Sequence, residues 1–269
     1  MSLLPHDHLR IHGMSMRNTE TDEVVRALPG QAGTFKSSYE AIKPAIDFSL
    51  TVLMLLPSVP LILLSIILVK LNSRGPAIYT QKRVGLEGKV FTIYKIRTMY
   101  QDSERTCGPR WCVPGDPRVT PVGRFLRWSH LDELPQLFNI LMGEMSLIGP
   151  RPERPEFVDQ LERALPKYRH RLMVRPGLTG LAQVQQPPDT DLFSVHRKLN
   201  YDLYYVESMN PWLDFRLIVA TLLKCLGVSF EWIGRILQLP DPNPRDTPKP
   251  SLPEPELTSS SLVPDMFVR

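Results

Sequence analysis

The hydrophobic pattern of the chain has one dominant feature, an uncharged apolar run from Phe48 to Val69 that lies between Asp47 and Lys70. As a straight helix with a rise of 1.5 Å per residue, these 22 residues would be about 33 Å long, enough to cross a hydrocarbon core of about 30 Å. The pattern therefore predicts a membrane-embedded segment over residues 40–72.

Two features bear on how this segment sits in a membrane. Pro57 and Pro60 lie near its middle, where each removes a helical hydrogen bond, so a sharp bend is expected there, which would be the break of a hairpin. Basic residues flank the run on both sides: Lys36, Lys43, Lys70 and Arg74. The positive-inside rule then assigns no orientation to a single crossing. A re-entrant helix hairpin satisfies both observations, and a kinked single crossing is the alternative, because membrane helices tolerate proline.

After the apolar run, the pattern changes to short strands and amphipathic helices. Ala77–Gln81 and Val90–Tyr94 predict strands that are separated by a glycine-containing turn. Residues 155–165 follow a helical period, and residues 212–237 predict a further amphipathic helix. We interpret this last helix as lying in a membrane interface, with an ordinary core-packing helix as the alternative. The fold class expected from these elements is α/β and rich in helix.

Composition divides the chain into four parts. With 42% hydrophobic and 22% charged residues, the chain is not disordered as a whole. Residues 1–39 lack a sustained apolar period and are expected to be a mobile leader, followed by the membrane segment over 40–72 and a folded domain over 73–239. Residues 240–269 contain eight of the 27 prolines and predict an extended, disordered tail.

Cys107 and Cys112 lack the second pair that a zinc site needs, so we expect reduced thiols.

Positive charge is concentrated directly after the apolar run. Residues 70–131 hold twelve Lys and Arg against four acids, a net +8, while the whole chain carries only +4. A basic stretch next to a membrane segment fits anionic lipid or phosphate-bearing ligands. No aromatic-basic recognition motif accompanies the charge, so nucleic acid is not expected as a partner.

The adjacent carboxylates Asp132 and Glu133 are the clearest candidate chemistry in the sequence. They precede Pro135 and a run with helical spacing, which places them at or just before a helix start, where orphan amides favour negative charge. A carboxylate in this setting is able to bind Mg²⁺ or to attack phosphorus. Arg151, in the sequence Gly-Pro-Arg-Pro, would supply bidentate contacts to phosphate. From the residues alone, an acidic turn that only stabilises the helix remains an alternative.

Several motifs in a fixed order extend these observations over about two-thirds of the chain. They are GPAIYTQKRVGLEGKVFTIYKIRTM (75–99), DPRVTPVGRFLR (116–127), LDELPQLFNILMGEMSLIGPRPE (131–153), VRPGLTGLAQV (174–184) and YDLYYVE (201–207). With the preceding apolar segment, the chain resembles the bacterial sugar transferase family, the monotopic phosphoglycosyl transferases.

The resemblance implies transfer of a sugar-1-phosphate from a nucleotide diphosphosugar, such as a UDP-sugar, to polyprenyl (undecaprenyl) phosphate. It implies that Asp132 is the nucleophile that forms a covalent phosphosugar intermediate and binds Mg²⁺, and that Glu133 assists. Arg151 matches the arginine that grips phosphate, and Arg127 and Arg97 are expected to be further contacts. The resemblance also implies a small catalytic domain on the cytoplasmic face of the inner membrane, held by a re-entrant hairpin and interfacial helices in contact with lipid.

Some positions depart from the family pattern. Leu181 replaces a frequent tryptophan, and Gln185 and Gln186 replace the common continuation after AQV, so the donor sugar is left open. His130 stands where small hydroxyl residues are common, and we expect a packing role for it, with tuning of neighbouring pKa values through its own titration as the alternative. The oligomeric state is also open, a homo-oligomer included. A non-catalytic membrane scaffold that binds anionic lipid and protein partners is the alternative function, although it would leave Asp132 and Glu133 without a chemical role.

Overall fold

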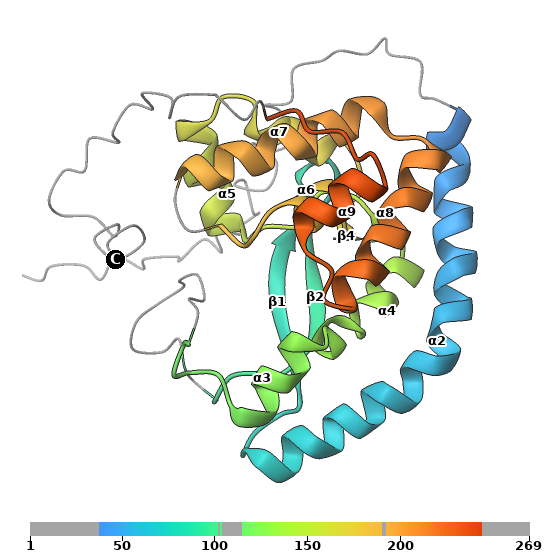
Figure 1. Cartoon of the computed structure of the whole chain (residues 1–269). Coiled ribbons are helices and arrows are strands. Elements are labelled where there is room, and N and C mark those ends of the chain that lie inside the picture. Colours follow the sequence, from blue (N-terminus) through green and yellow to red (C-terminus); the bar gives the residue numbers. More distant parts are fainter. Residues whose placement is uncertain (1–37, 102, 104–114, 190–191, 244–269) are drawn as a thin grey trace, which may run out of the picture. The chain divides into compact units, whose positions relative to one another are not determined.

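The computed structural model describes residues 38–101, 103, 115–189 and 192–243 (Figure 1). The described chain is mostly helical, with two small two-stranded sheets in place of one layered α/β sheet. The longer helices are α2 (Ser38–Asn72), α3 (Pro121–Trp128), α5 (Pro155–Ala164), α7 (Leu192–Ser208) and α8 (Pro211–Cys225). The shorter ones are α4 (Gln136–Leu141), α6 (Leu181–Gln185) and α9 (Phe230–Ile236), with 3-10 turns η1 (Leu86–Gly88), η2 (Leu131–Glu133) and η3 (Tyr168–Met173). The strands are β1 (Ile78–Val84), β2 (Val90–Ile96), β3 (Ser146–Ile148) and β4 (Gly177–Thr179).

The apolar run forms one long helix, α2, with Pro57 and Pro60 inside it. Figure 1 shows the helix axis changing direction part-way along its length. Proline removes one donor and crowds the preceding turn, which bends a helix without necessarily ending it. The two prolines therefore lie inside a helix that bends but continues through them. By length and composition α2 could cross a membrane, with a mean hydropathy of 2.8 over its most apolar window and only 22% of that window buried in the protein.

Both ends of α2 are attached to the rest of the fold. Near its start, the Tyr39 hydroxyl donates a hydrogen bond to Asp214 of α8 at 2.6 Å, and Ser146 of β3 donates to Asp47 at 2.6 Å. Near its end, Ile62 and Val69 pack with buried residues of the hairpin and of α3. The exposed apolar side chains of α2 are thus presented on a helix that is fixed at both ends.

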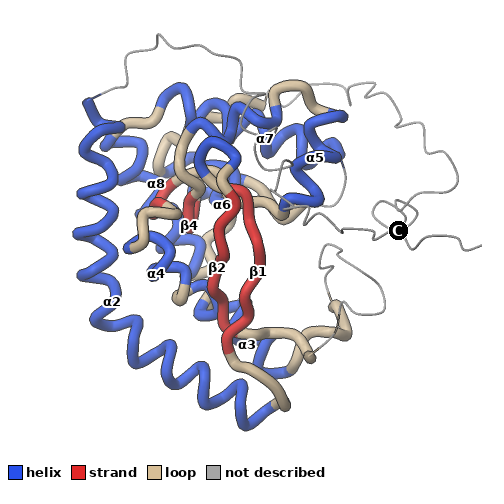
Figure 2. The backbone as a smooth tube through the Cα atoms, turned by 180° about the vertical axis from the view of Figure 1, so that it is seen from behind, coloured by secondary structure: helices blue, strands red, loops and turns tan. Residues whose placement is uncertain are grey.

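Strands β1 and β2 form an antiparallel hairpin, in the region where two short runs and a glycine-containing turn predicted strands. The register runs from Ile78 opposite Ile96 to Val84 opposite Val90. Phe91 and Ile93 of β2 are buried against the largest hydrophobic cluster. Figure 2 shows the hairpin as the longest strand pair, lying apart from β4.

Strands β3 and β4 form a short parallel pair that brings two sequence motifs together. Ser146 pairs with Gly177 and Ile148 with Thr179. Gly149 directly follows β3, and its backbone lies so close to Gly177 of β4 that a Cβ atom on Gly177 would be 2.1 Å from the Gly149 nitrogen. Any side chain at Gly177 would therefore push away the Gly-Pro-Arg-Pro segment that carries Arg151.

The C-terminal helices differ in part from the sequence-based expectation. Residues 155–165 form α5 as predicted. Residues 212–237 form two helices, α8 and α9, because the chain turns at Gly227, which adopts a φ of +82°. A positive φ is easily accessible only to glycine, so α8 ends at this point. The apolar period of the sequence continues past this helix end, which is why it predicted a single helix.

The described chain continues a few residues into the predicted tail. Tyr201 of α7 donates a hydrogen bond to Asp241 at 2.8 Å, and Asn243 is buried beside the same helix. The last two residues of the predicted leader, Ser38 and Tyr39, belong to α2. Residues 1–37 and the remainder of the tail lie outside the described residues, as do Cys107 and Cys112.

Candidate active site

Asp132 and Glu133 lie in the 3-10 turn η2, between α3 and α4. The sequence pattern placed them at or just before the start of the following helix, and α4 begins three residues after Glu133. Their charges are stabilised by cationic side chains from distant parts of the chain, not by the amides of a long helix. The site therefore depends on the tertiary fold.

Glu133 is held by two cations. The Lys95 ammonium of β2 lies 2.8 Å from Glu133 Oε1, and Arg151 bonds to the same carboxylate through both terminal nitrogens, with Nη1 at 3.2 Å from Oε2. Burial alone would raise the pKa of Glu133, but the charges of Arg151 and Lys95 outweigh it and hold that pKa well below its usual range. Glu133 is therefore ionised and keeps the two cations together.

Asp132 experiences a different balance of forces. Its side chain is buried, and burial together with the neighbouring charge of Glu133 raises its pKa to about 6. Lys95, Arg127 and Arg151 act in the opposite direction. The negative charge of Asp132 is therefore only partly compensated by the surrounding cations. A carboxylate of this kind suits a nucleophile or a ligand of a hard cation.

The structure brings Arg151 and Arg127 to the two acids but gives Arg97 other partners. Arg127 of α3 donates through Nε to Thr98 at 2.8 Å, and its charge acts on Asp132. Arg97 donates to the carbonyl oxygens of Ser73 and Arg74 just after α2, at 2.9 and 2.7 Å. A phosphate contact by Arg97 stays a prediction that these hydrogen bonds do not favour.

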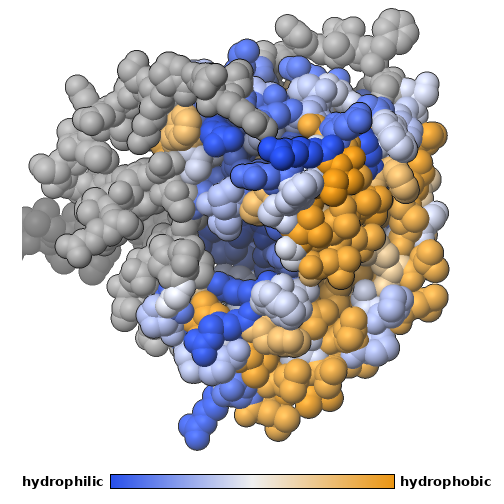
Figure 3. Space-filling model, in the orientation of Figure 1, coloured by the Kyte–Doolittle hydropathy of each residue, from blue (hydrophilic) through white to orange (hydrophobic). Residues whose placement is uncertain are grey.

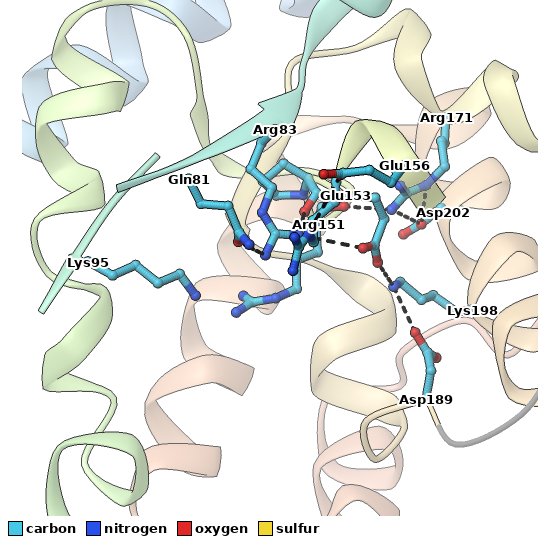
Figure 4. A network of polar contacts seen from close by, with 12 residues as sticks. Gln81, Arg83, Lys95, Arg151, Glu153, Glu156, Arg171, Asp189, Lys198 and Asp202 are labelled. Carbon is cyan, nitrogen blue, oxygen red and sulfur yellow. Dashed lines mark hydrogen bonds and ion pairs between the residues drawn. The ribbon is translucent and has the colours of Figure 1, made fainter. Parts of the chain in front are cut away.

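The backbone that carries Arg151 is clamped from both sides. Arg83 donates to the Pro152 carbonyl oxygen at 3.0 Å, and Arg171 donates to the Arg151 carbonyl oxygen at 2.7 Å. Arg171 is itself paired with Asp202 at 2.8 Å, almost fully buried. Figure 4 shows this network, with the side chains of Lys95 and Arg151 directed toward one another. Arg151 is thus fixed in direction before any ligand binds.

The same network reaches the segment that follows AQV in the sequence. Lys198 of α7 lies 2.6 Å from Glu153 and 2.8 Å from Asp189 (Figure 4). Because Glu153 follows Arg151 by two residues, Lys198 connects the arginine loop to the segment in which this chain departs from the family pattern.

His130 does not have the packing role that we expected. It is exposed and adopts a φ of +57°, a left-handed conformation that is uncommon for residues other than glycine. Partial burial lowers its pKa, against the pull of Glu133 and with the help of the Lys224 charge. His130 therefore faces the site and not the core.

Two cations of this site, Lys95 and Lys224, were not singled out from the sequence. Lys95 has the same strand parity as the buried Phe91 and Ile93, so an inward-facing lysine that needs an acid was a readable signal. Lys224 lies in the last turn of α8 and acts electrostatically on His130. Nothing in its local sequence distinguishes it from a lysine at an ordinary helix end.

The donor set fits Mg²⁺ bound mainly by substrate. Among the described residues, no group of three or more His, Cys, Asp or Glu could hold a metal ion. Mg²⁺ commonly takes one or two protein carboxylates and completes its shell with water and substrate phosphates. Asp132 is suited to this role, because the carboxylate of Glu133 already binds Lys95 and Arg151.

Comparison with known proteins gives the family. The model of the bacterial sugar transferase family matches residues 38–227, which include α2, both acids and all the cations described above. The chain belongs to the bacterial sugar transferase family. Membership therefore extends over the apolar helix as well as the domain that carries the site.

Similar curated proteins share the region of the site. One is a UDP-N-acetylgalactosamine-undecaprenyl-phosphate N-acetylgalactosaminephosphotransferase of Aeromonas hydrophila, 43% identical over 70% of this chain and 44% of the relative. Another is a UDP-glucose:undecaprenyl-phosphate glucose-1-phosphate transferase of Xanthomonas campestris pv. campestris, 37% identical over 73% of this chain and 41% of the relative. A putative undecaprenyl-phosphate N-acetylgalactosaminyl 1-phosphate transferase of Bacillus subtilis is 48% identical over 50% of this chain and 74% of the relative. The match thus spans less than half of the first two relatives.

Proposed function

We propose that this member of the family transfers a sugar-1-phosphate from a UDP-sugar to undecaprenyl phosphate, the step that initiates assembly of an exopolysaccharide or other glycoconjugate. The observation that carries the proposal is the buried, partly compensated carboxylate of Asp132, which directly precedes Glu133, the partner of the fixed arginine Arg151. The names of the relatives support the same donor and acceptor classes. Those names include different sugars, so the sugar is left to experiment.

In the proposed first step, an Asp132 carboxylate oxygen attacks the phosphorus that bears the sugar. A bond forms between this oxygen and phosphorus, the bond from phosphorus to the bridging oxygen breaks, and uridine monophosphate leaves with the electron pair. In the second step, an oxygen of the acceptor phosphate attacks the same phosphorus, and the aspartyl–phosphorus bond breaks. The products are a polyprenyl diphosphate sugar and free Asp132.

The surrounding side chains have separate roles in these steps. Mg²⁺, when bound through Asp132, would neutralise charge on the diphosphate. Arg151 offers its planar guanidinium to phosphate oxygens, and Lys95 adds positive charge behind Glu133. Glu133 holds both cations in place and is therefore a positioning residue.

We propose that α2 enters the inner membrane from the cytoplasmic side and returns to it at the bend. The exposed apolar side chains of the bent helix, together with those of α8 and α9, would then lie in the lipid interface (Figure 3). To test this topology, cysteines placed at Ser38 and Ser73 would be labelled in inverted and right-side-out vesicles. Labelling of both positions from the cytoplasmic side only is expected, and labelling from opposite sides would show a crossing.

The activity is tested with Asp132→Asn and Asp132→Ala variants and a panel of UDP-sugars. Wild-type protein should release uridine monophosphate with one sugar and, without acceptor, retain a radiolabelled phosphosugar adduct. Both variants should lose turnover and adduct while still fractionating with membranes. A near-normal rate in Asp132→Asn would remove this residue as the nucleophile. No release with any sugar would favour the non-catalytic scaffold.

A further inference from the structure

An open pocket of about 550 Å³ lies between the end of α3 and the end of α8. We name it the α3–α8 pocket and define it by its lining residues: Arg127, Trp128, His130, Lys224, Cys225, Leu226 and Gly227. The wall on the α8 side is rigidly built, because Gly227 and Val228 donate hydrogen bonds back to Lys224 and Leu223 in a Schellman motif.

The inner part of the pocket is cationic, and its lining residue His130 lies two residues before Asp132 in the chain. Arg127 acts electrostatically on Asp132, and Lys224 acts on Glu133 and Arg151. The Lys224 ammonium donates to the Gln183 carbonyl oxygen at 2.8 Å, and no carboxylate of the described residues lies within ion-pair distance of it. A partly buried ammonium that lacks a carboxylate partner favours an anionic ligand.

The outer part of the pocket is apolar and open. Trp128 is 76% exposed and Leu226 is 80% exposed, values that are unusual for large apolar side chains next to a polar site. The ring of Phe125 lies next to Trp128, with ring centroids 6.1 Å apart. Further apolar side chains of α8 and α9 are also exposed: Leu222, Trp232 and Ile236. Figure 3 shows a hydrophilic hollow on this face with apolar surface along its edge, over α8 and α9.

This combination selects one of the two substrate classes. A nucleotide diphosphosugar has a base that is able to stack on Trp128, but it has no long apolar chain to follow an apolar exit toward the lipid. A polyprenyl phosphate has a single anionic head joined to a long apolar chain, which matches the order of cations and apolar side chains in the pocket.

We propose that the α3–α8 pocket is the acceptor site, in which Arg127 and Lys224 hold the phosphate of polyprenyl phosphate while Trp128 and Leu226 guide its first isoprene units toward the lipid. This assignment rests on the proposed function. It makes Trp128 and Lys224 determinants of acceptor recognition and places the acceptor phosphate next to Asp132 for the second step.

Cys225 lines the same pocket and is exposed, which provides a direct binding assay. In full-length Cys107→Ser/Cys112→Ser protein, undecaprenyl phosphate should slow maleimide labelling of Cys225 at least about fivefold, because a bound ligand covers most of a pocket's surface. Undecaprenol and inorganic phosphate should not. Equal slowing by undecaprenol, or no slowing by any compound, would overturn the assignment.

The binding assay is kept separate from catalysis by adding Asp132→Asn. Protection of Cys225 in this variant should persist, whereas Lys224→Gln should abolish it. If the UDP-sugar panel yields no uridine monophosphate but protection persists, the proposed function fails and the pocket stands. If turnover occurs without protection, the pocket assignment alone fails.

A kinetic comparison tests the role of Trp128. Trp128→Ser should raise the KM for undecaprenyl phosphate about tenfold, as expected when an aromatic contact is lost from a binding site, and should change the KM for the UDP-sugar less. Trp232→Ser is the matched control, since Trp232 is 59% exposed on α9 and does not line the pocket. An equal effect of both variants would show general membrane attachment and would overturn the specific role of Trp128.

Discussion

The Lys43 ammonium of α2 lies 2.5 Å from the Asp214 carboxylate of α8, and both side chains are about nine-tenths buried. Tyr205 also donates a hydrogen bond to Asp214, at 2.8 Å. These contacts join the apolar helix to the helix whose far end forms the α3–α8 pocket. The position of the membrane segment and the position of the site are therefore structurally linked.

The Lys43–Asp214 pair should be important for stability because its loss leaves a buried charge. We expect Lys43→Met to lower the free energy of unfolding by about 3 kcal/mol, a typical cost of breaking a buried ion pair. Thermal unfolding in detergent would measure this, with Lys70→Met as the control at an exposed position of the same helix. Similar melting temperatures for the two variants would contradict the prediction.

Arg151 should be sensitive even to conservative replacement. Arg151→Lys keeps the charge but loses the planar two-nitrogen contact, so kcat/KM for release of uridine monophosphate should fall about 100-fold, equivalent to about 3 kcal/mol. Arg163→Lys, at an exposed position of α5, should have no effect. Rates within a few fold of wild type for Arg151→Lys would show that geometry at this arginine is unimportant.

The pH dependence of the first step should report on Asp132. Only the ionised carboxylate attacks, so with a pKa raised to about 6 the rate should fall as the pH drops through about 6. Glu133→Gln removes a neighbouring negative charge and should lower the pKa of Asp132, moving the acid limb to lower pH by about one unit while the rate itself falls. Single-turnover release of uridine monophosphate at fixed Mg²⁺ would measure both limbs. An acid limb that stays at the same pH or moves to higher pH in Glu133→Gln would exclude an effect of the Glu133 charge on the pKa of Asp132.

Glu153 should make the fold sensitive to acid. Burial alone would raise its pKa, but the charges of Lys198, Arg171 and Arg83 prevail and lower it to about 2. Because this folded-state pKa is depressed, its contribution is complete above the ordinary value near 4.5 and is lost as the pH falls from there toward 2.

The shift corresponds to about 3 kcal/mol, since one pKa unit is about 1.4 kcal/mol. Denaturation at pH 7 and pH 4 should therefore show a smaller acid-induced loss of stability for Glu153→Gln than for wild type. Glu207→Gln, at an exposed position of α7, is the control. Parallel losses in all three proteins would rule out this origin of acid sensitivity.

Local patterns predicted the secondary structure where one face is buried. The alternation around Phe91 and Ile93 gave the hairpin, and the period over residues 155–165 gave α5. The patterns were less informative where conformation depends on a single residue. Gly227 ends α8 inside a continuous apolar period, and the sequence did not decide whether α2 continues through the bend at Pro57 and Pro60.

The candidate site divides in the same way. The sequence by itself made Asp132, Glu133 and Arg151 candidates, because their motifs are short and contiguous, and the resemblance to the family supplied their expected roles. Only the tertiary structure showed that Glu133 binds both Lys95 and Arg151, that Arg97 bonds instead to the chain just after α2, and that the charge of Lys224 interacts with those of Glu133 and Arg151. Helical and strand periods are local, so a single chain segment records them. The partner of a buried charge is chosen by packing between distant segments, and that information is absent from any one of them.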